Sequence, residues 1–132
     1  MTLGVRGVVT DENGRVLLLQ HTYIPGWHLP GGGVERGATG EAALARELVE
    51  EAGVEITRRP RLLSIHSNES YFPGDHVIVY RVEGWRPVPA TSKNEIHELG
   101  WFAPDDLPVE AGSSTRARIC EAFFGEAPSP LW

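Results

Sequence analysis

The apolar positions near the start of the chain fall in short runs that predict strands. Leu3 to Thr10 is rich in β-branched residues, Arg15 to Gln20 is a second apolar run, and Asp11 to Gly14 between them has turn-forming residues. We expect these two runs to form a β-hairpin. A shorter extended piece, Trp27 to Leu29, precedes the glycine run Gly31 to Gly33. There we expect a loop whose backbone turns sharply and approaches a ligand.

The spacing of apolar residues becomes helical from Gly40 to Ala52. Thr39 suits an N-cap, and Gly53 is placed to end the helix in the left-handed conformation. On a helical wheel the apolar residues share one side, which we expect to pack on the core. They are Ala42, Leu44, Ala45, Leu48, Val49 and Ala52.

The second half of the chain predicts further strands and a last helix. The expected strands are Arg61 to His66, His76 to Glu83 and Ile96 to Phe102, with a polar loop from Ser67 to Asp75, and the helix runs from Ser113 or Ser114 to Phe124. No repeat or linker divides the sequence. We therefore expect one α/β domain over residues 1–132, with a mixed β-sheet between helices.

Three carboxylates gather on the polar face of the Gly40 to Ala52 helix. With about 100° per residue, Glu47, Glu50 and Glu51 share an arc of roughly 100°. Two carboxylates about 6 Å apart repel by roughly 3 kcal/mol at an effective dielectric constant near 20. Arg46, four residues before Glu50, relieves only part of this repulsion.

A divalent cation would neutralise this acidic face. Hard oxygen ligands select Mg²⁺ or Mn²⁺ over zinc or copper. The glycine run just before the helix offers backbone groups to phosphates or to a metal, so together they suit a metal-bound phosphate ligand. The alternative interpretation is that the three glutamates form only a solvated helix face.

The same residues resemble the signature box of the Nudix hydrolases. Gly32 is followed, at the family's spacing, by Arg46 to Val54, which reads RELVEEAGV, and the WHLPGG stretch at Trp27 to Gly32 is also similar to the family. The resemblance implies the Nudix fold and hydrolysis of a nucleoside diphosphate linked to another moiety, such as a nucleoside triphosphate or a nucleotide sugar. It also implies a divalent metal and a water molecule that attacks phosphorus.

The resemblance assigns roles by position. The metal ligands that it implies are Glu47, Glu50, Glu51, the Gly31 carbonyl and Glu95. Arg46 would orient Glu47, and Glu98 is the rival of Glu95 as the later carboxylate. Because clustered glutamates titrate as a group, the spacing leaves open which one is the base; we favour Glu47 or Glu95.

One position departs from the family pattern. Ala38 stands where the box has its first glutamate, and Glu41 is a weak candidate to replace it. This departure motivates an alternative function, in which the domain is a catalytically weak or inactive Nudix-fold module that binds or senses a nucleotide.

Several residues outside the acidic face are candidates for substrate binding. Trp27 and Tyr71 could stack on a nucleobase, although most aromatic residues in small domains belong to the core. His28 and Arg6 could reach phosphate, or could be a satisfied structural histidine and one half of an ion pair. Gly32 and Gly33 bring backbone to the ligand. We expect specificity to depend on the Ser67 to Asp75 loop.

The overall charge agrees with a small-molecule substrate. The formal net charge is −6, which argues against stable, sequence-blind binding to nucleic acid, and most of the excess acid is assigned to the candidate site. Apolar runs are too short for a membrane span, and no apolar signal core precedes Asp11. Cys120 has no partner for an intrachain disulfide. We expect a cytoplasmic protein, able to pair as a homodimer.

Overall fold

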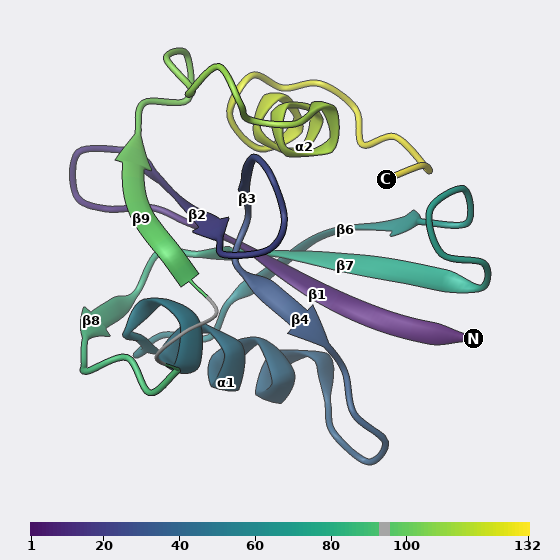
Figure 1. The fold of residues 1–132 in the computed structure, drawn as a ribbon, viewed down its shortest axis with the longest axis horizontal. Helices are drawn as coiled ribbons and strands as arrows, with labels where there is room; N and C mark the ends of the chain where they lie inside the picture. The colour runs from purple at the N-terminus through teal and green to yellow at the C-terminus, as the bar shows by residue number, and fades with distance from the viewer. Residues whose placement is uncertain (93–95) are drawn as a thin grey trace.

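The computed structural model describes residues 1–92 and 96–132, which form one mixed and two antiparallel β-sheets between two helices (Figure 1). The strands are β1 (Thr2–Val9), β2 (Val16–His21), β3 (Trp27–His28), β4 (Gly31–Gly33), β5 (Val54–Ile56), β6 (Arg61–Ser67), β7 (Asp75–Val82), β8 (Trp85–Pro87) and β9 (Ile96–Phe102), and the helices are α1 (Gly40–Ala52) and α2 (Ser113–Phe123). The α/β fold class predicted from the sequence is confirmed.

The strands are arranged in three sheets. The largest has the order β4-β1-β7-β6, with β1 and β7 parallel and the other pairs antiparallel. A second sheet has the order β3-β2-β9, and β5 pairs with β8 in a third. The parallel pair joins residues about half the chain apart, since Thr2 lies opposite Asp75. The N-terminal end of β1 therefore lies beside the loop between β6 and β7.

The predicted hairpin between β1 and β2 is wrong, although both strands and their turn exist. The turn closes with Asp11 N–H donating to the Arg15 carbonyl at 3.0 Å, and a single bridge joins Thr10 to Val16. Beyond that bridge the strands separate into different sheets. The reason is that β1 already has a partner on each side, β4 and β7, so neither edge is left for β2.

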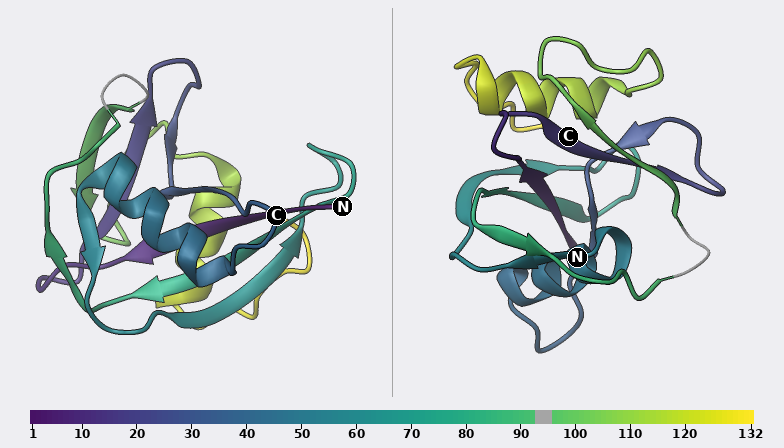
Figure 2. Two further views of the ribbon diagram at one scale, coloured as in Figure 1. Left: turned by 90° about the horizontal axis from the view of Figure 1, so that it is seen from below. Right: turned by 90° about the vertical axis from the view of Figure 1, so that its left-hand side faces the viewer.

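The core has two layers because side chains alternate along the central strands. Val5 and Val9 of β1 pack with Leu44 and Leu48 of α1, whereas Val8 faces the other way and packs with Ile119 of α2. Figures 1 and 2 show the two helices on opposite sides of the strands. The sheets are thus enclosed by α1 on one side and α2 on the other.

Helix α1 has the ends that the sequence predicts. The Thr39 hydroxyl accepts a hydrogen bond from the Ala42 N–H at 3.0 Å, and Gly53 ends the helix with a φ of 64°. Both caps satisfy backbone groups that a helix end leaves unpaired. They fix where α1 begins and ends, and therefore which way its glutamates point.

The segment 126–132 after α2 is held against β6. The Ser67 N–H donates to the Pro130 carbonyl at 2.7 Å, and the Trp132 N–H donates to the Ser67 carbonyl at 2.8 Å. Beneath it, Arg118 makes two hydrogen bonds to the Glu121 carboxylate, at 2.8 and 3.0 Å. His66, which is fully buried, contacts the Ser129 carbonyl at 2.6 Å.

This buried histidine predicts a pH dependence of stability. Burial lowers the pKa of His66, and the Arg118 guanidinium lowers it further. The unfolded chain, with a histidine pKa of about 6.5, then binds this proton more readily than the folded chain. The contribution of His66 to stability should be complete above about pH 6.5 and should decrease as the pH falls below it.

Two measurements check this expectation. The pKa of His66, measured from its ring signals by NMR, should be lower than the usual histidine pKa. The free energy of unfolding, measured with urea, should be smaller at pH 5.5 than at pH 7.5. Titration of the His66 ring at or above the ordinary histidine value would contradict the prediction.

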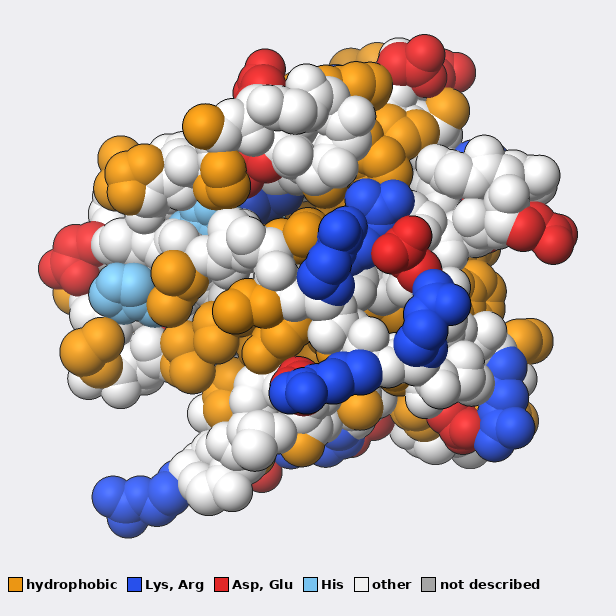
Figure 3. Space-filling model, turned by 180° about the vertical axis from the view of Figure 1, so that it is seen from behind, with side chains coloured by type: hydrophobic (Ala, Val, Ile, Leu, Met, Phe, Trp, Pro, Cys, Tyr) orange, Lys and Arg blue, Asp and Glu red, His pale blue; other side chains and the backbone are white. Residues whose placement is uncertain are grey.

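The surface carries both signs of charge. On the face opposite to the view of Figure 1, basic side chains lie among acidic and hydrophobic ones (Figure 3). In the described part of the chain, neither helix combines the length and the hydrophobicity needed to cross a bilayer.

Candidate active site

The glycine run forms the short strand β4 rather than the predicted loop; Gly31 lies close to the backbone of β1, and Gly32 lies close to the Glu47 side chain. A Cβ atom added to Gly31 would lie 1.9 Å from the Val5 carbonyl oxygen, and one added to Gly32 would lie 2.6 Å from the Glu47 carboxyl carbon. At Gly33 a Cβ would meet no atom within 4 Å. The backbone of β4 therefore fits tightly between β1 and the side chain of Glu47.

A pair of alanine substitutions tests this packing. Gly31→Ala should destabilise the fold by at least about 1–3 kcal/mol, the usual cost of overpacking, because β1 would have to move. Gly33→Ala is the matched control on the same strand and should leave stability within about 0.5 kcal/mol. Urea unfolding of both variants measures the difference, and equal stabilities would contradict the close packing at Gly31.

Two of the three glutamates on the acidic face of α1 lie against consecutive residues of β4. The Gly31 N–H donates to Glu51 Oε1 at 2.9 Å, and Glu51 is only 6% exposed. The Glu47 carboxyl group packs on Gly32, as its distance to an added Cβ shows. The Glu50 side chain is more open to solvent, at 43% exposed. The acidic face of α1 is thus more than a solvated surface, because it forms part of the contact with β4.

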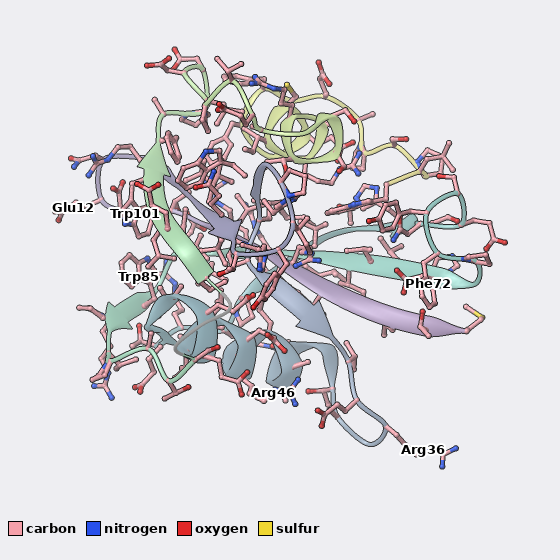
Figure 4. The ribbon with its side chains drawn as sticks, viewed as in Figure 1. Glu12, Arg36, Arg46, Phe72, Trp85 and Trp101 are labelled. Atoms are coloured by element: carbon pink, nitrogen blue, oxygen red, sulfur yellow. The ribbon has the colours of Figure 1, made fainter. Side chains whose placement is uncertain are left out.

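Arg46 contacts three acidic side chains around this contact. Its guanidinium lies 3.2 Å from Glu35, 3.3 Å from Glu47 and 3.9 Å from Glu50. It also donates to the Gly33 carbonyl at 3.5 Å. Figure 4 shows Arg46 on α1. The predicted neighbour relation between Arg46 and Glu47 is present. Glu35 was missed, because nothing in its spacing from Arg46 indicates a contact across the loop.

The pKa values of Glu47 and Arg6 are both shifted toward the neutral form. Burial raises the pKa of Glu47, and the negative charge of Glu50 adds to this, while Arg46 and Arg6 act in the opposite direction. Burial lowers the pKa of Arg6, against the attraction of Glu51, Glu47 and Asp75. Strong opposing effects on titratable groups are common where a protein binds or transforms a charged ligand.

The donor set suits a hard divalent cation that is only partly coordinated by protein. Within residues 1–92 and 96–132, no three acidic, histidine or cysteine side chains are grouped so that they could hold a metal ion. Mg²⁺ usually keeps several waters and is bound through one or two carboxylates together with substrate phosphates, so a complete cage is not required. The carboxylates of Glu47 and Glu51, which extend from α1 against adjacent residues of β4, fit that kind of site.

A cleft of about 360 Å³ opens beside β4 and brings four predicted residues together. Arg6, Gly32, Gly33 and Tyr71 all line it. Its other lining residues are Thr2, Leu3, Gly4, Asn68, Phe72, Asp75, Val77 and Trp132. The Ser67 to Asp75 loop, predicted to govern specificity, thus contributes to the cleft. Sequence reasoning did not single out Trp132.

Two other candidates for substrate binding have structural contacts. The ring of Trp27 is packed edge-to-face against Phe102 in the core, with centroids 5.0 Å apart and 8% of the residue exposed. The structure therefore places Trp27 where an aromatic core residue is expected. The His28 ring contacts the Pro25 carbonyl at 2.9 Å and lies 5.8 Å from the ring of His21.

The later carboxylate of the predicted site is only partly described. Glu95 lies outside the described residues, so its role stays a prediction. Its rival Glu98 is exposed on β9, opposite Gln20 of β2. Ser92 is the last described residue before Glu95. Its N–H donates a hydrogen bond to the Glu50 carbonyl at 3.0 Å.

Glu41, the candidate to replace the box glutamate that is missing at Ala38, forms a two-point ion pair with Arg59, with both hydrogen bonds at 3.0 Å. Glu35 supplies an acidic partner of Arg46 from the loop before α1.

Comparisons with known proteins agree with this geometry. The family model described as NUDIX domain matches residues 1–123. A MutT-like protein of Streptomyces ambofaciens is 30% identical over 127 residues, which cover 96% of this chain and 80% of that protein. A protein named putative 8-oxo-dGTP diphosphatase, from Bacillus subtilis (strain 168), is 27% identical over 82% of this chain and 70% of its own length.

A solved structure shows the same fold. The MutT NUDIX hydrolase from Burkholderia pseudomallei superposes with a TM-score of 0.76, at 30% identity, over 89% of this chain and 95% of its own. The chain belongs to the NUDIX domain family. It is an enzyme of the Nudix pyrophosphohydrolase class, as its sequence predicts.

Proposed function

We propose that this protein hydrolyses a phosphoanhydride bond in a nucleoside diphosphate linked to another moiety, using Mg²⁺ or Mn²⁺. The observation that carries the proposal is the contact of Glu47 and Glu51 with consecutive residues of β4, beside a cleft that Gly32 and Gly33 also line. The name of the Bacillus subtilis relative, a putative diphosphatase of a nucleotide, supports the same substrate class.

Different residues of the site would bind the cation, orient a carboxylate and accept a proton. Glu47, Glu50, Glu51 and the Gly31 carbonyl would hold the cation, with Glu95 as a further ligand. A bound divalent cation would neutralise the pyrophosphate and favour attack by water. Arg46, which contacts Glu47 at 3.3 Å, would orient that carboxylate. Either Glu47 or Glu95 would accept the proton of the attacking water.

The charge of Arg6 suits the phosphate end of the substrate. Arg6 lines the cleft, donates to the Leu29 carbonyl at 3.4 Å, and is attracted by Glu47 and Glu51. A guanidinium remains charged and offers several donors, which match phosphate oxygens. We infer that Arg6 contacts phosphate oxygens of the substrate next to the carboxylates of Glu47 and Glu51.

A substrate screen tests the proposal directly. Purified protein is incubated with nucleoside triphosphates, dinucleotides and nucleotide sugars, each with Mg²⁺ and with Mn²⁺, in water enriched in ¹⁸O. Metal-dependent products with ¹⁸O on one phosphate are expected, and the labelled product identifies the phosphorus attacked. Absence of turnover on the whole panel with either metal would contradict the proposal.

The departure at Ala38 favours one alternative, a module that binds a nucleotide with little or no turnover. Nucleotide binding in the presence of metal, without products in the same screen, would support this alternative. We also propose that the chain functions as one cytoplasmic domain, with a small-molecule substrate, no stable nucleic-acid partner and the capacity to form a homodimer.

A further inference from the structure

The 126–132 segment lies beyond the part of the chain that the family model matches. It is nonetheless fixed to the fold by backbone hydrogen bonds on both sides of Ser67, to Pro130 and Trp132. Figure 1 shows this segment returning from α2 to the loop between β6 and β7. The segment therefore brings Trp132 to the cleft beside β4.

The indole of Trp132 contacts two side chains of the fold. The Arg118 guanidinium lies over its ring, 5.1 Å from the centroid, and the His66 ring lies 5.8 Å away at an angle of 66°. Arg118 also donates to the Trp132 carbonyl at 2.9 Å. Trp132 is thus anchored by side chains of the fold and also lines the cleft, where a ligand can contact it.

Two further aromatic rings line the same cleft from the loop between β6 and β7. Tyr71 is 85% exposed and Phe72 is 54% exposed, although large aromatic rings gain free energy from burial. Figure 4 shows Phe72 at this end of the molecule, far from the stacked pair Trp85 and Trp101. Exposed rings beside an indole form flat, apolar walls that suit a planar ligand.

The cleft also has a hydrogen-bonding edge. Asp75 accepts hydrogen bonds from the Thr2 hydroxyl at 2.6 Å and from the Asn68 amide at 3.0 Å, and all three residues line the cleft. Burial alone would raise the pKa of Asp75, but these two hydrogen bonds help to hold it below its usual value. An ionised carboxylate next to flat apolar walls can accept a hydrogen bond from the N–H edge of a base.

We propose that Trp132 is a specificity-determining residue that stacks on the nucleobase of the substrate. The inference rests on the proposed function and deepens it by naming the residue through which the enzyme prefers substrates that carry a base over phosphoanhydrides that lack one. The strand register supports it, because Gly31 lies opposite Arg6 of β1, whereas Asp75, which follows the loop that carries Tyr71 and Phe72, lies opposite Thr2 at the N-terminal end of β1.

The experiment compares Trp132→Ala with Trp132→Phe and with Tyr23→Ala, a control in an exposed aromatic residue of another loop. Each is assayed on nucleoside triphosphates and on 5-phosphoribosyl diphosphate, which has a diphosphate but no base. Loss of base stacking, about 1–3 kcal/mol, should raise KM for nucleotides by roughly 5- to 150-fold. We expect kcat, and KM for the base-free compound, to stay unchanged, and Trp132→Phe to restore most of the nucleotide KM.

Two results would overturn the inference: an unchanged nucleotide KM in Trp132→Ala, or an equal rise in KM for the base-free compound. If Trp132→Ala does not fold, Trp132→Leu, which keeps an apolar side chain against Arg118, is assayed in its place. The same two results would then overturn the inference.

A binding measurement separates this inference from the proposed function. If wild-type protein hydrolyses nothing, saturation-transfer NMR with guanosine and adenosine 5′-monophosphates reports on the base site alone. Transfer to the base protons in wild type and its loss in Trp132→Ala would support the role of Trp132 without catalysis. Absence of transfer in wild type, or equal transfer in both proteins, would refute it.

Discussion

Replacing Glu47 by glutamine should lower kcat by about 10²- to 10⁴-fold, the range that a general base contributes. The substitution keeps the shape of the side chain and removes its negative charge. The carboxyl group packs on Gly32 and accepts a hydrogen bond from Arg46, so the variant should fold normally while losing a metal ligand or base. Steady-state kinetics with Mg²⁺ and with Mn²⁺ measures the loss.

Glu41→Gln is the matched control on the same helix. Its carboxylate pairs with Arg59, whose side chain is 83% exposed, and has no assigned role in the reaction. We expect its kcat to equal that of wild type. A comparable loss of kcat in the two variants would show that the effect is not specific to Glu47, and would contradict its assigned role as metal ligand or base.

Replacing Arg118 by methionine should destabilise the fold by about 3–5 kcal/mol, the usual result of removing one partner of a buried ion pair. The Arg118 and Glu121 side chains are 1% and 9% exposed. Without the guanidinium, the Glu121 carboxylate keeps the Ser129 N–H but loses its two strongest hydrogen-bond donors. The hydrogen bond to the Trp132 carbonyl is lost as well. Urea unfolding measures the change.

Arg59→Met is the control for this second prediction. Arg59 also makes a two-point pair with a glutamate, but on the surface, where such pairs contribute about 0–1 kcal/mol. Arg118→Met should therefore lower the free energy of unfolding several times more than Arg59→Met. Similar losses from the two substitutions would show that burial does not set the importance of the Arg118 pair.

Local signals predicted α1 and its glutamates, because they act within a few residues. Thr39 and Gly53 set the ends of the helix, and its apolar spacing set the buried face, so Glu47 and Glu51 had to point together. The same locality explains the error in strand pairing. The turn at Asp11 to Gly14 is real, but a turn says nothing about whether β1 finds other partners along both of its edges.

The cleft was predicted only in part, because its walls come from distant segments. Arg6, Gly32, Gly33 and Tyr71 were singled out for their chemistry, and the structure brings them together. Trp132 joins them through backbone pairing of its segment with Ser67, a contact between residues 65 apart in the sequence that no local pattern records. Chemistry-bearing residue types are readable from sequence, whereas the partner of an extended segment depends on the completed sheet.

The central claim is that the acidic face of α1 and the glycines of β4 hold a divalent cation next to a diphosphate. Crystals soaked with Mn²⁺ and a non-hydrolysable nucleoside triphosphate analogue test it most directly, by anomalous scattering at the manganese edge. We expect a manganese peak between the carboxylates of Glu47, Glu50 and Glu51 and the phosphates of the analogue. Bound analogue with no manganese beside these three glutamates would contradict it.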